Sequence, residues 1–276
     1  MAGSLGPIDT MDDRPDHRTG DTYTFGDSPT AADRLRPLAE VYAPPTRDLL
    51  ARWAPPAPAH ALDLGCGPGH TTHLVHAATG ATRTTGIERS PEHLARARAA
   101  PRPGVAFVEA DVTVAPLPVD PADLVFVRHL LTHLSDPAAA LRGWTRALRP
   151  GGRMLVQETA VLTSDQPTLA RYYELVGDLQ RHHGQDLEIG ARLGALADAA
   201  GLHVVSCEQR PVRVPQHLMA RLHALNLPVW RRDPYARAAF DAPELADLER
   251  RLAALARSPV PGAAVEHVLG ELVVGV

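Results

Sequence analysis

Three glycines at alternate positions follow a short apolar stretch in the first quarter of the chain. Residues 61–64 read Ala-Leu-Asp-Leu, and Gly65, Gly67 and Gly69 come directly after them. Glycines leave the backbone bare where a buried strand turns sharply into a helix, so a ligand can approach the main chain closely. The sequence therefore predicts a ligand-binding loop at residues 65–69.

Two common ligands of glycine-rich loops do not suit this spacing. A dinucleotide fingerprint continues to Gly or Ala at the sixth place, where this chain has His70. A Walker A loop needs Gly-Lys followed by Ser or Thr, and the chain contains no lysine. The loop therefore argues against NAD, FAD and the phosphates of a P-loop ligand.

Two carboxylates follow at the ends of the next two predicted strands. Glu88 ends the strand at 84–88 and lies 19 positions after Gly69. Asp111 follows the strand at 105–109. The carboxyl ends of parallel strands meet at one edge of a sheet, so both acids should lie near the glycine loop. Glu88 can accept hydrogen bonds from both hydroxyls of a ribose, whereas Asp111 could also simply cap a turn.

Taken with two later segments, these residues resemble the class I S-adenosylmethionine-dependent methyltransferases. Residues 130–137 read Leu-Leu-Thr-His-Leu-Ser-Asp-Pro, as in small-molecule members, and residues 149–152 read Arg-Pro-Gly-Gly, which is similar to the family's LxPGG turn. The resemblance covers roughly residues 60–160. It implies an α/β fold with a seven-stranded, mostly parallel, Rossmann-like sheet, an antiparallel last strand, and S-adenosylmethionine as the cofactor.

The resemblance also assigns roles to the loop and the strand ends. The loop passes under the methionine end of the cofactor, and Glu88 holds the ribose. Asp111 accepts the exocyclic amine of adenine, and the next backbone amide, that of Val112, donates to a ring nitrogen. The predicted cofactor-binding residues are Asp63, Gly65, Gly67, Gly69, Glu88, Asp111, Val112 and Arg128.

A general base is optional in this chemistry, because a sulfonium is already an excellent leaving group and the protein mainly aligns the reactants. The candidates are His129 and His133, which follow the fourth strand and share a face if that segment is helical. His133 could equally be a packing residue. We expect no metal site, since a metal held by His70, His73 and His76, on the helix after the loop, would compete with the cofactor.

Two further residues are predicted to contact the substrate. Glu158 ends the fifth strand and faces the same crevice, where a carboxylate could hold a cationic or hydroxylated acceptor or have only a structural role. Tyr23 belongs to an aromatic N-terminal segment that often folds over the ligands in the resembling family; anchoring the tail is the alternative. Other candidates for the acceptor pocket are Tyr172, Tyr173, His182, His183 and Trp230.

Strand and helix patterns alternate along most of the chain, as is typical of a parallel sheet covered on both faces. We predict a methyltransferase domain at 57–276 with a helical insertion at about 211–265, before the last strand. Residues 21–56 should form an N-terminal helical cap of two short helices around Pro44-Pro45. Residues 1–20 are polar and rich in Asp, Gly and Pro, which predicts disorder.

Composition limits the partners and the compartment. The 276 residues are 45% hydrophobic, and a net charge of -4 gives no electrostatic case for nucleic acid. No run of apolar residues is long enough to suggest a membrane span. Cys66 and Cys207 are a poor disulfide pair, so we expect a reducing cytoplasm. The sequence leaves open whether the chain forms a homo-oligomer.

These patterns predict transfer of a methyl group from S-adenosylmethionine to an oxygen, nitrogen or carbon atom of a small molecule, in bacterial secondary metabolism. The alternative is a protein that keeps the cofactor but catalyses a cyclisation or rearrangement, or binds it for regulation. Both functions need the same glycine loop and the same two acids. The sequence does not separate them.

Overall fold

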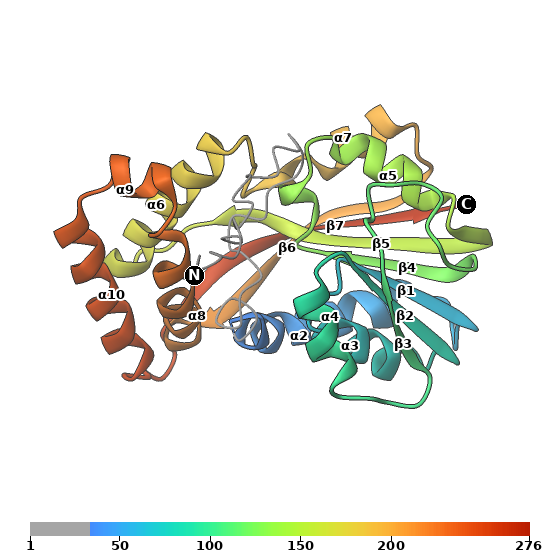
Figure 1. Cartoon of the computed structure of the whole chain (residues 1–276), viewed down its shortest axis with the longest axis horizontal. Helices are drawn as coiled ribbons and strands as arrows, with labels where there is room; N and C mark the ends of the chain where they lie inside the picture. The colour runs from blue at the N-terminus through green and yellow to red at the C-terminus, as the bar shows by residue number, and fades with distance from the viewer. Residues whose placement is uncertain (1–33) are drawn as a thin grey trace, which may run out of the picture.

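The computed structural model describes residues 34–276, which form one twisted sheet with helices on both faces (Figure 1). The strands are β1 (His60–Leu64), β2 (Arg83–Glu88), β3 (Val105–Glu109), β4 (Ala122–Arg128), β5 (Leu148–Leu162), β6 (Val204–Pro215) and β7 (Ala264–Gly275). They lie in the order β3-β2-β1-β4-β5-β7-β6. The first five pair in parallel, and β7 runs antiparallel to both β5 and β6. The predicted fold class is confirmed.

The helices are α2 (Leu35–Trp53), α3 (His70–Thr79), α4 (Pro91–Arg98), α5 (Pro137–Thr145), α6 (Pro167–His182), α7 (Leu193–Ala200), α8 (Gln216–Trp230), α9 (Pro234–Ala239) and α10 (Ala242–Ala256), with short 3-10 turns η1 (Leu131–His133) and η2 (Ile189–Arg192). Helices α5 and α7 cover one face of the sheet, and α2 and α3 cover the other (Figure 1). Helices α6, α8, α9 and α10 gather beyond one end of the long strands β5, β6 and β7 (Figure 1).

Alternate side chains of β4 serve the two layers of the core. Leu124 and Phe126 pack with α2 and α3, whereas Val125 and Val127 pack with α5 and α7. This is the period of two expected of a strand buried on both faces. A third cluster joins α6, α8 and α10 to the far ends of β6 and β7. The sheet thus forms a rigid support from which the loops at its carboxyl edge project.

The N-terminal cap differs from the prediction. Pro44 and Pro45 lie inside one helix of 19 residues, α2, rather than between two helices. A proline in a helix interior removes a hydrogen bond and costs about 3 kcal/mol. Here Tyr42, Pro45 and Leu49 are buried against the rest of the protein, and this packing outweighs the local cost. The predicted disordered tail at 1–20 and Tyr23 lie outside the described residues.

Strands β6 and β7 extend into the region predicted to be a helical insertion. We expected helices over about 211–265, but β6 continues to Pro215 and β7 begins at Ala264, and the two strands pair along the whole length of β6. Pro211 is tolerated because β6 is an edge strand, where one side of the backbone needs no ladder partner. Three helices, α8 to α10, then lie between β6 and β7. No helix within residues 34–276 combines the length and apolar character needed to cross a membrane.

Candidate active site

The glycine loop has the backbone shape that only glycine adopts easily. Gly65, Gly67 and Gly69 all have positive φ, at 66°, 53° and 83°. A Cβ added at Gly65 would lie 2.8 Å from the side chain of Leu130, and one at Gly69 would lie 2.8 Å from Phe107. The N–H groups of residues 65 and 66 donate to the Ile87 carbonyl, which fixes the loop against β2. Gly65 and Gly67 line a large cavity, and Gly69 begins α3 just behind it.

Glu88 holds the glycine loop and the start of α4 together. One carboxylate oxygen accepts the Gly67 N–H at 2.9 Å, and the other accepts the N–H groups of Arg89 and Ser90, each at 2.9 Å. Ser90 caps α4 through the His93 N–H, as its position before Pro91 predicts. Glu88 also lines the cavity, so one carboxylate both shapes the loop and faces a ligand resting on it.

Asp111 and Val112 line the same cavity on the β3 side of the loop. Asp111 accepts hydrogen bonds from the Thr113 N–H at 2.8 Å and from the Thr113 hydroxyl at 2.7 Å. It therefore caps a turn, which was the alternative interpretation, while facing the cavity as well. The Val112 carbonyl accepts the indole N–H of Trp144 at 2.8 Å, which orients this peptide.

Asp63 and Arg128 differ in how they relate to the cavity. Asp63 is 1% exposed, accepts the Thr72 hydroxyl at 2.7 Å, and lies behind the loop rather than in the lining. Burial raises the pKa of Asp63 to about 7. Arg128 does line the cavity, and its guanidinium donates to the hydroxyls of Thr46 and Thr71 at 2.9 and 3.1 Å. Burial lowers the pKa of Arg128 to about 10, although Asp63 opposes this shift.

Both candidate bases line the cavity, but not in the predicted arrangement. His129 has φ of 52°, and His133 ends the 3-10 turn η1, so the two do not share a face of an α-helix. The left-handed backbone at His129 prevents a helix from starting at that residue. Burial lowers the pKa of each to about 3. Both imidazoles are therefore neutral at pH 7 and are weak bases, which does not favour the predicted role of general base.

Glu158 anchors the segment that carries these histidines. One carboxylate oxygen accepts the N–H groups of Leu130 and Leu131 at 2.8 and 2.9 Å. The side chain is 1% exposed by area yet borders the cavity. Burial raises the pKa of Glu158 to about 7, and the two backbone hydrogen bonds oppose that shift. Glu158 thus has the structural role that was one alternative, at a position where it also faces bound ligands.

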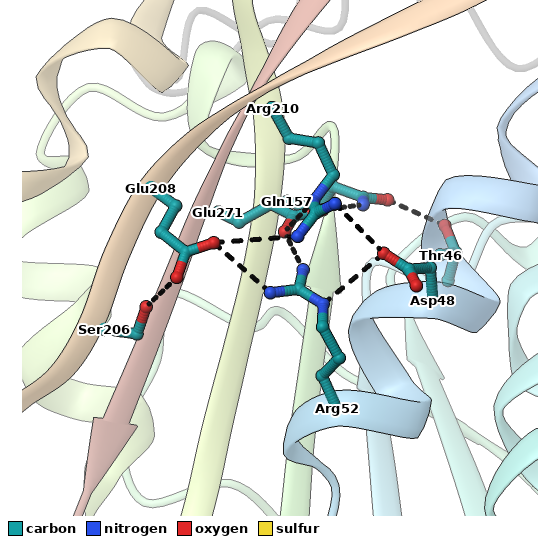
Figure 2. Close-up of polar contacts among 8 residues, drawn as sticks. All are labelled: Thr46, Asp48, Arg52, Gln157, Ser206, Glu208, Arg210 and Glu271. Carbon is teal, nitrogen blue, oxygen red and sulfur yellow. Dashed lines mark hydrogen bonds and ion pairs between the residues drawn. The ribbon is translucent and has the colours of Figure 1, made fainter.

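Thr46, which accepts a hydrogen bond from Arg128, begins a polar network that runs to Arg52 on α2. Figure 2 shows this network from Thr46 onward. Thr46 donates to the Gln157 side chain at 2.7 Å, and Gln157 donates to Glu271 at 3.0 Å. Glu271 is 2% exposed. Its carboxylate accepts hydrogen bonds from Arg52 of α2 and, at 3.3 Å, from Arg210 of β6. A buried carboxylate is stable only when it is paired in this way. The network joins α2 to β4, β5, β6 and β7 next to the cavity.

Helices α6 and α8 complete the lining of this cavity, which measures about 800 Å³. From α6 come Tyr172, Val176 and Gln180, each four residues apart. Of the other pocket candidates, Tyr173 and Trp230 are buried without facing the cavity, His182 stacks on Tyr235, and His183 pairs with Asp233. Sequence reasoning missed the polar lining residues Arg34, Gln180, His223 and Asn226. Their signal is a polar residue within an otherwise apolar helical stripe.

The glycine loop, Glu88 and the turn at Asp111 together fit an adenosyl ligand. Bare backbone at residues 65–67, the carboxylate of Glu88 and the turn at Asp111 lie along one wall of one cavity. Within residues 34–276, no three side chains of His, Cys, Asp or Glu are grouped so that they could hold a metal ion. The cavity therefore presents hydrogen-bonding groups suited to a nucleoside.

Comparison with known proteins agrees with this geometry. Residues 62–156 match the family described as methyltransferase domain. Trans-aconitate 2-methyltransferase of Methylobacterium nodulans is 44% identical over 127 residues, which cover 46% of this chain and 48% of that protein. The enzyme of the same name from Methylobacterium radiotolerans is 34% identical over 171 residues, 62% of each chain.

Solved structures share the fold. Phosphoethanolamine N-methyltransferase 2 of Haemonchus contortus, in complex with phosphomonomethylethanolamine and S-adenosylhomocysteine, gives a TM-score of 0.53 at 17% identity, covering 88% of this chain and 57% of that one. The cyclase SpnF gives 0.51 at 20% identity, covering 86% and 82%. The same fold is thus found in a protein described as a cyclase.

The methyltransferase-domain match at residues 62–156, the methyltransferase relatives and the shared fold support a class I S-adenosylmethionine-dependent methyltransferase, and S-adenosylmethionine is the cofactor that the loop and acids fit. The chain spans about half the length of the first curated relatives that it matches. The family match ends at residue 156, before α6 and α8 begin. The part of the cavity that those helices line is therefore outside the family match.

Proposed function

We propose that this protein transfers the methyl group of S-adenosylmethionine to an oxygen, nitrogen or carbon atom of a small molecule. The observation that carries the proposal is the continuity of one cavity of about 800 Å³, whose lining includes the glycine loop and Glu88 as well as side chains of α6 and α8. Cavities of this size hold a ligand of small-molecule dimensions. We assign the α6 and α8 part of the lining to the methyl acceptor.

The chain's own residues act mainly by positioning. When bound, the cofactor supplies a methyl group on a positively charged sulfur that departs readily. The glycine loop and Glu88 would hold its adenosyl part, while the buried side chains of Tyr42, Tyr172 and Leu222 line the cavity around the reactants. Alignment of two reactants is worth about 7–11 kcal/mol of the barrier. A histidine whose pKa is about 3 contributes little as a base at pH 7, so alignment carries the rate enhancement.

The names of the curated relatives suggest a first acceptor to test. They are trans-aconitate 2-methyltransferases, and a carboxylate acceptor has no proton to lose before methylation. We propose a role in bacterial secondary metabolism. The lining from α6 and α8 lies outside the family match, so the match does not assign the acceptor, and trans-aconitate is tested beside other small molecules. A cytoplasmic location agrees with the unpaired thiols of Cys66 and Cys207.

Incubation with methyl-labelled S-adenosylmethionine and a panel of acceptors tests the proposal, with S-adenosylhomocysteine release as the readout. The panel contains trans-aconitate, phenols, hydroxylated rings and secondary amines. Acceptor-dependent release that is lost in a Glu88→Ala variant supports the proposal. Tight cofactor binding with no release across the panel would instead favour the cyclisation or regulatory alternative, and absence of cofactor binding would refute both.

A further inference from the structure

Two buried side chains in the acceptor part of the cavity have polar atoms without a partner. Gln180 of α6 is 1% exposed and His223 of α8 is 5% exposed, and both line the cavity. In the described part of the chain, Gln180 Oε1 and His223 Nδ1 are shielded from solvent and make no hydrogen bond. A buried polar atom left unpaired destabilises the folded protein. A ligand that satisfies both atoms would relieve that destabilisation.

The neighbouring polar residue is different in this respect. Asn226, one turn after His223 on α8, accepts a hydrogen bond from Arg34 at 3.4 Å and pairs with Tyr172. Its side chain is therefore engaged within the protein. Unpaired atoms are confined to Gln180 and His223 among the polar side chains that α6 and α8 contribute to the lining. This contrast singles out these two residues as recognition groups.

A chain of buried hydrogen bonds fixes the proton of His223. Tyr42 contacts His267 Nδ1 at 3.1 Å, His267 Nε2 contacts the Tyr173 hydroxyl at 3.1 Å, and that hydroxyl contacts His223 Nε2 at 3.4 Å. Only one placement of the hydrogens gives both the Tyr42 and the Tyr173 hydroxyl an acceptor among these four residues. Tyr42 donates to His267, His267 donates to Tyr173, and Tyr173 donates to His223 Nε2. His223 then carries its proton on Nδ1, which is a donor.

The imidazole is also held in place and kept neutral. It stacks on Tyr172 with ring centroids 4.0 Å apart and an interplanar angle of 23°. Burial lowers the pKa of His223 well below 6.5. The two unpaired atoms are thus a fixed neutral donor, His223 Nδ1, and an acceptor, Gln180 Oε1.

We propose that Gln180 and His223 determine acceptor specificity, and that they select an uncharged acceptor carrying a hydroxyl, carboxamide or lactam group. The inference rests on the proposed function, because it assigns this part of the cavity to the acceptor. A group that satisfies both atoms must accept from His223 and donate to Gln180. A carboxylate accepts but does not donate, and an ammonium donates but does not accept. Arg34 in the same lining favours an anion, so a carboxylate is the competing outcome.

Benzamide and benzoate are suitable probes, because they share a ring and differ in whether the polar group is a neutral donor and acceptor or an anion. The full chain is first saturated with S-adenosylhomocysteine, which occupies the cofactor end of the cavity. Binding of each probe at millimolar concentration is then followed by ligand-observed NMR. We expect benzamide to bind at least tenfold more tightly than benzoate, and Gln180→Met and His223→Phe each to weaken benzamide by about tenfold, the loss of one hydrogen bond.

Controls separate recognition from a structural role. His217→Phe, on α8 outside the cavity lining, should leave benzamide binding unchanged. Gln180→Met should keep the affinity for S-adenosylhomocysteine and raise the Tm of the free protein by roughly 2–4 °C, because it removes an unpaired buried oxygen. Equal or tighter binding of benzoate, no binding of benzamide to the loaded protein, or a lowered Tm for Gln180→Met would overturn the proposal. Failure to bind S-adenosylhomocysteine would instead contradict the proposed function.

Discussion

Glu88 provides the sharpest test of the cofactor site. Its carboxylate accepts three backbone N–H groups, including that of Gly67 in the loop, and it lines the cavity. The change Glu88→Gln keeps the shape but replaces one accepting oxygen by an N–H₂ donor. The new N–H₂ group then faces a backbone N–H group, so that two donors oppose each other. A hydrogen bond to a charged group contributes about 1.5–3 kcal/mol, so the Kd for S-adenosylmethionine should rise about 10- to 150-fold.

Glu109 is the matched control for this experiment. It lies opposite Glu88 in the register of β3 with β2, but it is exposed and does not line the cavity. Isothermal titration calorimetry of wild type, Glu88→Gln and Glu109→Gln at the same pH measures the three Kd values. Only Glu88→Gln should weaken binding. Equal Kd values for Glu88→Gln and wild type, in variants with native circular dichroism, would refute the assignment of Glu88 to the cofactor.

Three further substitutions test the support of the site. A Cβ in Gly86→Ala would lie 2.7–2.8 Å from three side chains, so the Tm should fall by an amount equivalent to about 1–3 kcal/mol, whereas Gly143→Ala has open space and should not lower it. Thr46→Val removes an acceptor of Arg128 and should cost about 1–3 kcal/mol in urea unfolding and weaken cofactor binding. The pKa of Glu158 is about 7 in the folded protein and 4.5 in the unfolded chain, so the folded state binds its proton more tightly. The free energy of unfolding should therefore fall as the pH rises from about 5 to 7, and Glu158→Gln should flatten that profile.

The cofactor end of the site was predictable because its residues are local in sequence. The loop at 65–69 and Glu88 each follow directly from a strand, and parallel strands bring their ends together whatever the details of packing. Positive φ at the three glycines is likewise a property of single residues. These features depend on short stretches of chain, so they can be recognised in the sequence.

The acceptor end was not predictable for the opposite reason. Gln180 and His223 are 43 residues apart, on helices whose relative placement depends on the third hydrophobic cluster. Nor does a histidine reveal its pKa in sequence: His129 and His133 were candidate bases, and burial lowers the pKa of each to about 3. The single helix across Pro44-Pro45 has the same origin, since tertiary packing outweighed a local rule.

The protonation of Asp63 and Glu158, the two buried acids near Arg128, should respond to the charge of the cofactor. Arg128 raises the acidity of both Asp63 and Glu158, yet burial keeps the pKa of each at about 7, so both are part-protonated at neutral pH. S-adenosylmethionine carries a positive sulfur that S-adenosylhomocysteine lacks, and a nearby positive charge favours the ionised carboxylate.

Binding of the sulfonium at pH 7 should therefore release a larger fraction of a proton than binding of S-adenosylhomocysteine. Calorimetric titrations in phosphate and in Tris, which differ in ionisation enthalpy, measure that release for each ligand. Glu158→Gln removes the acid that borders the cavity and should reduce the difference between the ligands. Equal proton release for both ligands in the wild type would mean that these acids do not respond to the methyl-bearing charge, and that the sulfonium lies elsewhere in the cavity.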